Sequence, residues 1–221
     1  IIINSRDKKS IEEHFTPNPA LEAELRSRGK DKYAEKVAHA GNLNVSYVYQ
    51  EEPLGLGHAV HCAADCIDGE PFFVLLGDVL VPDNQMLIRM KEVSDAHNGA
   101  SVIAVLPVAP EEVDRFGVIA GSEVEEGVWK VDSLVEKPPV DEAPSNLAVF
   151  GRYLLTPRVM DLLAEVEPGA GGEIQLTDAL DALLQEEEMY ALVIDPEEGY
   201  DTGTIESWLD TNNRLYKKMH G

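Results

Sequence analysis

The first half of the chain alternates short apolar runs with longer stretches in which apolar residues recur at helical spacing. The runs lack polar alternation, as in strands buried on both faces: residues 1–3, 45–49, 72–76 and 101–107. Helices are expected from a capping box at Ser10-Ile11-Glu12-Glu13, then over 20–38, 55–66 and 84–97. This order predicts an α/β fold, with a Rossmann-like, mostly parallel sheet and helices on both faces.

The pattern changes in the second half of the chain. Three expected strands follow one another through Gly- and Pro-rich turns, which predicts a small antiparallel insertion: residues 116–120, 129–136 and 147–155. An apolar stripe at helical spacing, a late strand and a terminal helix complete the chain: 176–184, 189–194 and 207–218. The sequence contains no internal repeat and no linker, so we expect one domain over residues 1–221.

The charge balance narrows the classes of partner. The chain has 18 Lys and Arg residues against 41 Asp and Glu residues, a formal net charge of −23. Such a surface repels nucleic acid and anionic membranes, so we expect neither as a partner. No apolar run approaches the roughly 20 residues of a membrane span, and no signal peptide is present, so we expect a cytoplasmic protein. A nucleotide site on this chain would need a divalent cation or local positive charge.

Two aspartates lie where open α/β sheets place their ligands. Asp78 directly follows the apolar run 72–76, at the carboxyl end of an expected buried strand. Asp201 lies between the strand at 189–194 and the last helix. Two such carboxylates suit Mg²⁺, which keeps its other positions for water and phosphate. Position alone equally fits aspartates that cap a turn, so both interpretations stay open at this point.

Two further segments carry polar groups next to expected strand ends. The loop from Gln50 to His58 contains Gly55 and leads into a helix, where free N–H groups and close backbone approach favour a phosphate or a base. The Gln50 amide can pair with a base edge, because it carries both a donor and an acceptor. Glu136 and Lys137 end a strand, where the lysine can meet a phosphate and the glutamate can accept from hydroxyls. Each segment alone is also typical of ordinary surface structure.

Taken together and in order, these segments resemble the sugar-phosphate nucleotidyltransferase family, and within it the bacterial UTP–glucose-1-phosphate uridylyltransferases. The similarity spans essentially the whole chain. The most specific combination is Ala143-Pro144-Ser145-Asn146-Leu147-Ala148 followed by Gly172-Glu173-Ile174-Gln175-Leu176-Thr177-Asp178, and Gly151-Arg152-Tyr153 also carries the resemblance. Supporting stretches are Ser10 to Phe15, Gly55 to Val60, Phe116 to Ile119 and Val135 to Pro138.

The resemblance implies a glycosyltransferase-A-like nucleotidyltransferase fold and a reaction. The phosphate of glucose 1-phosphate attacks the α-phosphorus of UTP in line, giving UDP-glucose and pyrophosphate. By the same resemblance, Gln50 and Gly55 contact the uracil, and Asp78 and Asp201 hold Mg²⁺. Lys137 binds the sugar phosphate and, with Asp78, acts in catalysis. The remaining sugar-binding residues that it implies are Gly117, Glu136, Gly172 and Glu173.

The sequence departs from the family pattern at three places. The family's first strand and its glycine-rich loop, with an Arg and a Lys that cradle the triphosphate, do not occur here. We therefore expect the chain alone to be inactive. Gly77 stands where the uridylyl branch usually has proline, and 200–204 looks more like the thymidylyl branch. The alternatives are thus a glucose-1-phosphate thymidylyltransferase and a non-catalytic regulatory paralogue. The family also implies a dimer or tetramer.

Overall fold

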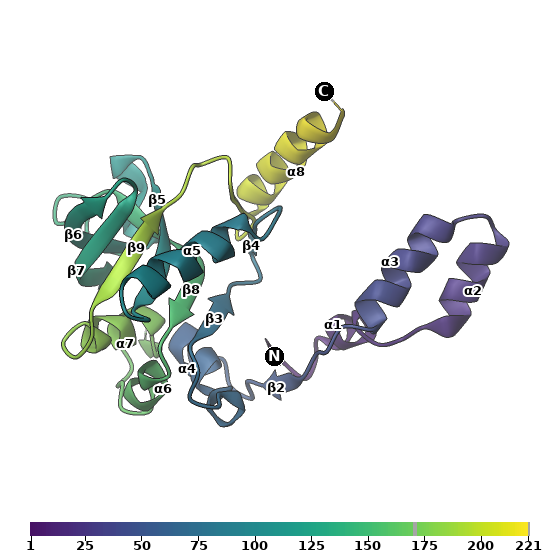
Figure 1. Cartoon of the computed structure of the whole chain (residues 1–221), viewed down its shortest axis with the longest axis horizontal. Coiled ribbons are helices and arrows are strands. Elements are labelled where there is room, and N and C mark those ends of the chain that lie inside the picture. Colours follow the sequence, from purple (N-terminus) through teal and green to yellow (C-terminus); the bar gives the residue numbers. More distant parts are fainter. Residues whose placement is uncertain (170–171, 221) are drawn as a thin grey trace.

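The computed structural model describes residues 1–169 and 172–220. Its centre is a six-stranded sheet in the order β3-β8-β5-β9-β7-β6 (Figure 1). The strands are β3 (Phe72–Leu75), β5 (Ser101–Pro107), β6 (Gly117–Glu125), β7 (Val128–Glu136), β8 (Leu147–Leu155) and β9 (Met189–Val193). The bounds of β5 and β8 are those predicted from their apolar runs.

Helices cover both faces of this sheet, as expected. Alternate residues of β5 enter separate cores: Ile103 and Val105 lie in one, and Val102 and Ala104 in the other. The first core is completed by α4 (Leu56–His61), α6 (Arg158–Leu163) and α7 (Leu176–Leu183). The second is covered by α5 (Gln85–Ala96) through buried Met86 and Met90. The two-residue period of the strands therefore separates two apolar layers.

The expectation of a mostly parallel sheet was wrong. In the described part of the large sheet, β5 and β9 form the one parallel pair, and the other neighbours are antiparallel. The reason is that β8 returns between β3 and β5, which run in the same direction but do not touch as a pair. The β6–β7 hairpin extends the sheet beyond β9. The expected antiparallel insertion is thus part of the main sheet.

The first fifty residues form a separate layer beside the sheet. β1 (Ile2–Asn4) pairs in parallel with β2 (Tyr47–Tyr49), and no further strand joins this pair within the described residues. Between them run α1 (Lys9–His14), α2 (Pro19–Ser27) and α3 (Asp31–Gly41), and α2 and α3 form an arm that points away from the sheet (Figure 1).

Several expectations for this layer need correction. Ile1 is 55% exposed, and Ile2 and Ile3 are half-buried, because neither face of the β1–β2 pair is covered as a central strand would be. Helix α1 begins after Lys8 and no side chain caps it, so the expected capping box at Ser10 does not form. The helix expected over 20–38 is two helices, broken where Gly29 takes a positive φ of 68°.

The last part of the chain returns to the end of β3. β10 (Tyr200–Asp201) forms a two-residue antiparallel ladder with β4 (Val79–Leu80). Helix α8 (Ile205–His220) follows and projects from the body of the fold (Figure 1). Two short 3₁₀ helices, Ala64–Cys66 and Pro110–Arg115, complete the described elements. No described helix is both long enough and apolar enough to cross a bilayer.

The apolar layer between α7 and the sheet predicts the effect of a core truncation. Leu180 on α7 is 1% exposed, and Leu180→Ala should lower the free energy of unfolding by about 2–5 kcal/mol. The matched variant Leu209→Ala lies on α8, where the leucine is 54% exposed, and should change stability by less than about 0.5 kcal/mol. Urea denaturation measures both. Equal effects would contradict the assignment of α7 to the core.

Candidate active site

Asp78 and Asp201 are brought side by side by the β4–β10 ladder. Asp78 lies in the turn between β3 and β4, and Asp201 is the last residue of β10, where it pairs with Val79. One oxygen of each carboxylate lies close to Gly203. A Cβ placed on Gly203 would lie 3.1 Å from Asp201 Oδ1 and 3.4 Å from Asp78 Oδ2. The two acidic groups therefore border one small space that the missing glycine side chain leaves open.

Hydrogen bonds fix both backbones at this point. Thr202 donates its N–H (2.8 Å) and its hydroxyl (2.7 Å) to the Asp78 carbonyl. The Thr211 hydroxyl of α8 donates to the Asp201 carbonyl (3.0 Å). The Gly203 N–H donates to Asp201 Oδ1 (2.9 Å), which is the turn contact that the alternative interpretation of Asp201 expected. The bonds at Asp78 use its backbone carbonyl, and its Oδ2 borders the same space beside Gly203 as Asp201 Oδ1.

This pair fits a hard divalent cation that also binds phosphate. Asp78 is exposed and Asp201 half-buried, and two neighbouring carboxylates repel each other unless a cation lies between them. Within residues 1–169 and 172–220, no group of three or more His, Cys, Asp and Glu side chains is placed to hold a metal. The protein therefore offers two carboxylates from this pair's side chains, and a cation there would complete its shell with water and ligand oxygens, as Mg²⁺ prefers.

A second group of predicted residues meets at the end of β7. Gly117 pairs with Glu136 across the β6–β7 ladder, and a Cβ on Gly117 would lie 3.1 Å from Glu136 Oε2. The Thr177 hydroxyl, in the first turn of α7, donates to the same oxygen (2.8 Å). Lys137 Nζ lies 3.5 Å from Glu136 Oε1. The Glu136 carboxylate thus lies beside Gly117 of the adjacent strand, accepts a hydrogen bond from Thr177 of α7 and pairs with the Lys137 ammonium.

Lys137 has an unusual backbone conformation. Its φ is +46°, in a left-handed region that non-glycine residues rarely adopt, and the following Pro138 further favours extended conformations. The Lys137 N–H donates to the Phe116 carbonyl (3.0 Å), which holds the residue in this conformation. Its side chain remains 54% exposed. Strain of this kind concentrates at functional sites, where it aims a side chain.

The third group is the glycine-containing loop before α4. Gln50 Nε2 donates to the Gly55 carbonyl (3.0 Å) and to His58 Nδ1 (2.9 Å), so this histidine is a hydrogen-bond acceptor here. Gly55 has a φ of +111°, and a Cβ on it would lie 2.6 Å from the Ile174 carbonyl and 2.9 Å from the Cβ of Glu173. The loop therefore packs directly on the segment that carries Glu173.

The segment from Gly172 to Thr177 connects the second and third groups. Gly172 lies in an exposed turn with a φ of +77°, and its N–H donates to the Gly169 carbonyl (3.0 Å). Gln175 Nε2 donates to Glu173 Oε2 (3.2 Å), and Thr177 reaches Glu136. Residues 170 and 171 lie outside the described residues. The segment 172–177 thus contacts the glycine-containing loop at one end and Glu136, at the end of β7, at the other.

Tyr153 links the second group to the aspartate pair. It lies on β8, is 6% exposed and faces the core below α4, α6 and α7. Burial raises the pKa of its phenol, and the negative charges of Glu136 and then Asp78 add to that rise. Glu136 and Asp78 are thus both within electrostatic range of this one buried hydroxyl. Lys137, by contrast, has its ion pair with Glu136 and not with either aspartate.

Sequence reasoning missed three residues that the structure places here: Arg152, Tyr153 and Thr177. Arg152 and Tyr153 were quoted for the resemblance but received no role. A signal was present, because an arginine and a glycine interrupt the otherwise apolar run of β8. A charged residue inside a buried strand must have partners, and these partners were the missing information.

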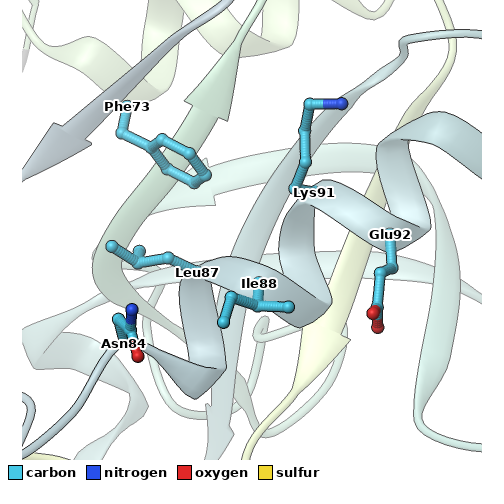
Figure 2. Close-up of a pocket in the computed structure, with 6 residues that line it drawn as sticks. All are labelled: Phe73, Asn84, Leu87, Ile88, Lys91 and Glu92. Atoms are coloured by element: carbon cyan, nitrogen blue, oxygen red, sulfur yellow. The ribbon is translucent and has the colours of Figure 1, made fainter.

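Two hollows on the surface lie away from these groups. One, of about 340 Å³, is lined by Phe73 and by side chains along α5: Asn84, Leu87, Ile88, Lys91 and Glu92. Figure 2 shows Phe73 facing Leu87 and Ile88. Another, of about 540 Å³, lies by α1 and is lined by Arg6, Lys9, Glu12, Glu13, Thr16 and Tyr49. None of the predicted site residues lines either hollow, so the hydrogen-bonded clusters above define the candidate site better than surface shape does.

Comparison with known proteins shows the family of the chain. A model of the nucleotidyl transferase family matches residues 1–218. The chain belongs to this family. Among curated nucleotidyl transferases, it is 42% identical over 205 residues to the UTP–glucose-1-phosphate uridylyltransferase YngB of Bacillus subtilis, covering 92% of this chain and 68% of the relative. It is 36% identical to the UTP–glucose-1-phosphate uridylyltransferase of Pseudomonas aeruginosa, covering 99% and 79%.

Solved nucleotidyl transferase structures have the same fold. A UDP-glucose pyrophosphorylase complexed with UDP-glucose superposes with a TM-score of 0.85 at 36% identity, over 98% of this chain and 80% of the other. A UTP-bound enzyme from Acinetobacter baumannii gives 0.82 at 34%, over 97% and 76%. A glucose-1-phosphate thymidylyltransferase from Bacillus anthracis gives 0.64 at 23%, which shows the common fold alone. The α/β fold with a mixed sheet is therefore the family's fold.

The contact between the glycine-containing loop and Glu173 can be tested through Gly55. Gly55→Ala places a Cβ against the Ile174 carbonyl in addition to straining a positive φ, and should lower stability by about 3 kcal/mol. In Gly29→Ala the φ is also positive but the space is open, so about 1 kcal/mol is expected. Chemical denaturation of both variants gives the comparison. A Gly55→Ala variant as stable as Gly29→Ala would show that this packing is absent.

Proposed function

We propose that this chain is the nucleotidyltransferase domain of a UTP–glucose-1-phosphate uridylyltransferase, which forms UDP-glucose and pyrophosphate. The observation that carries the proposal is the meeting of Asp78 and Asp201 beside Gly203. Glu136 and Lys137 supply groups for a sugar phosphate, and Glu136 and Asp78 are both within electrostatic range of the Tyr153 hydroxyl. A cation-bound polyphosphate and a sugar ester would thus have neighbouring binding groups on one fold.

The chemistry needs positioning and charge neutralisation more than a general base. The attacking phosphate oxygen of glucose 1-phosphate is already anionic, so no proton has to be removed from it. We assign Asp78 and Asp201 as the residues that would hold Mg²⁺, which would neutralise charge on the UTP phosphates when bound. Lys137 would hold the sugar phosphate in line with the α-phosphorus, and its constrained backbone would limit its motion.

The sugar would lie against the Glu136 group. The Thr177 hydroxyl occupies one side of Glu136 Oε2, which leaves the carboxylate's remaining lone pairs to accept from sugar hydroxyls. Gly117 leaves room beside this carboxylate, because a Cβ there would lie 3.1 Å from it. Glu173 and Gly172 would close the other side, since their segment leads to Thr177 and is exposed at Gly172.

The base would be read by Gln50 and the backbone at Gly55. Gln50 already donates through Nε2 to Gly55 and His58, so its Oε1 is left to accept from a base N–H. Uracil and thymine both present an N3–H donor, so this contact suits either base. The choice between UTP and dTTP therefore depends on the methyl group of thymine and on the ribose 2′-hydroxyl.

Binding of the sugar nucleotide tests these roles in the chain as it stands. Glu136→Gln removes charged hydrogen bonds to the sugar and should weaken UDP-glucose binding about 10- to 100-fold by calorimetry. Glu126→Gln, at the opposite, exposed end of the same hairpin, should leave the affinity unchanged. Equal affinities of both variants and the native chain would remove Glu136 from the site.

The same titration with dTDP-glucose separates the two nucleotide preferences. The uridylyl assignment expects weaker binding of dTDP-glucose, and tighter binding would assign the thymidylyl alternative instead.

We also propose that the chain alone does not turn over. Arg152 is bonded to three carbonyls, so among the described site residues Lys137 is the basic group offered to phosphates, against the four negative charges of a triphosphate. With UTP, glucose 1-phosphate and Mg²⁺, the chain should release no pyrophosphate above background in a coupled assay. The Bacillus subtilis relative serves as the positive control. Robust turnover by the chain would refute this proposal.

A further inference from the structure

The site contains a buried guanidinium for which the proposed chemistry has no use. Arg152 is 7% exposed and is the one charged side chain among the buried residues that the structure describes. Its Nη1 donates to the carbonyls of Leu76 (3.1 Å) and Gly151 (2.9 Å), and its Nη2 donates to the carbonyl of Val79 (2.6 Å). The Leu76 and Val79 carbonyls lie before and after Asp78 in the same turn. A buried charge is costly unless it is satisfied, so this arrangement calls for an explanation.

A bulge in β8 directs Arg152 to this turn. The register with β5 shifts between Val105, opposite Val149, and Ile103, opposite Tyr153, so three residues of β8 oppose one of β5. Gly151 lies in this bulge with a φ of +60°. A Cβ on it would lie 2.9 Å from Val79 Cγ2, so the bulged backbone touches the turn. Bulges commonly re-aim a side chain next to a site.

We propose that Arg152 is a positioning residue that holds the Leu76–Val79 turn so that the Asp78 carboxylate faces Asp201. The inference rests on the proposed function, because it gives the aspartate pair a cation to bind. Arg152 fixes the turn from the β8 side, and Val79 at its end pairs with Asp201 across the β4–β10 ladder. The turn is thereby held at both ends, and Asp78 lies between the two attachments.

The chemistry of arginine suits this role and that of lysine does not. A guanidinium is planar and presents several N–H donors in a fixed fork, which can bond two carbonyls on opposite sides of a turn at once. A lysine ammonium also carries three donors, but they diverge from one nitrogen on a flexible stem and would not set the distance between the carbonyls. Arg152 also lies within electrostatic reach of Asp78.

Manganese binding tests the inference without turnover. Mn²⁺ substitutes for Mg²⁺ and is counted by electron paramagnetic resonance in the native chain and in Asp78→Asn, Arg152→Lys, Arg152→Met and Arg158→Met. Loss of an outer-shell partner typically weakens metal binding about 10- to 100-fold, and we expect this for both Arg152 variants. Arg158 is an exposed arginine on α6, paired with Asp161 and Glu186, and its variant should bind like the native chain.

Thermal unfolding, followed by circular dichroism, separates position from stability. Folded Arg152→Lys and Arg152→Met variants that bind Mn²⁺ within about twofold of the native chain would overturn the role of Arg152. If Arg152→Met does not fold, Arg152→Lys decides by the same criterion, and at least tenfold weaker binding by the folded variant supports the role. A native chain that binds no more Mn²⁺ than Asp78→Asn would overturn the proposed metal site itself, and the inference with it.

Discussion

The arrangement of the site depends on one short antiparallel ladder, in which two residues of β4 pair with two residues of β10. The β4–β10 ladder is only Val79–Leu80 against Tyr200–Asp201, yet it joins the end of a central strand to the segment before the last helix. Without it, Asp78 and Asp201 would have no reason to meet, because they come from distant parts of the chain. Thr202 then ties the two sides together, and Thr211 ties α8 to Asp201. Hydrogen bonds of neutral groups thus hold two negatively charged carboxylates close together. A bound cation would reduce the repulsion between them.

The other candidate binding groups lie where strands of the large sheet, and a helix packed on it, begin or end. Glu136 and Lys137 end β7, Gly117 begins β6, and Thr177 lies in the first turn of α7. The sheet is rigid because two apolar cores pack against its faces, so side chains at its margin are held in place without metal or disulfide. Lys137 differs from these side chains in its backbone, because its positive φ is a strained conformation and Pro138 follows it. This strain agrees with a residue that is selected for its position.

Much of this could be predicted from the sequence, and the remainder has physical causes. The apolar runs gave β5 and β8 to the residue, and the end of the run at 72–76 indicated Asp78 correctly as a strand-end carboxylate. Strand order could not be predicted, because whether β8 pairs between β3 and β5 depends on long-range burial that local periodicity does not encode. The β1–β2 pair misled for the same reason, since an apolar run does not say what covers it.

The remaining site residues show a similar limit. Gln50, Gly55 and Glu173 were proposed from separate segments, and their packing through Ile174 depends on a contact that no local pattern reveals. Arg152 was visible as an interruption of β8, but two of the carbonyls that it bonds lie on the Asp78 turn. Roles that depend on partners distant in sequence therefore required the fold.

The proposed function requires Asp78 and Asp201 to bind one cation together at the phosphates of a sugar nucleotide. Anomalous diffraction from crystals of this chain grown with Mn²⁺ and UDP-glucose would locate that cation. We expect an anomalous peak bonded to carboxylate oxygens of both aspartates and to the diphosphate. A bound diphosphate whose metal contacts neither aspartate, or only one of them, would contradict it.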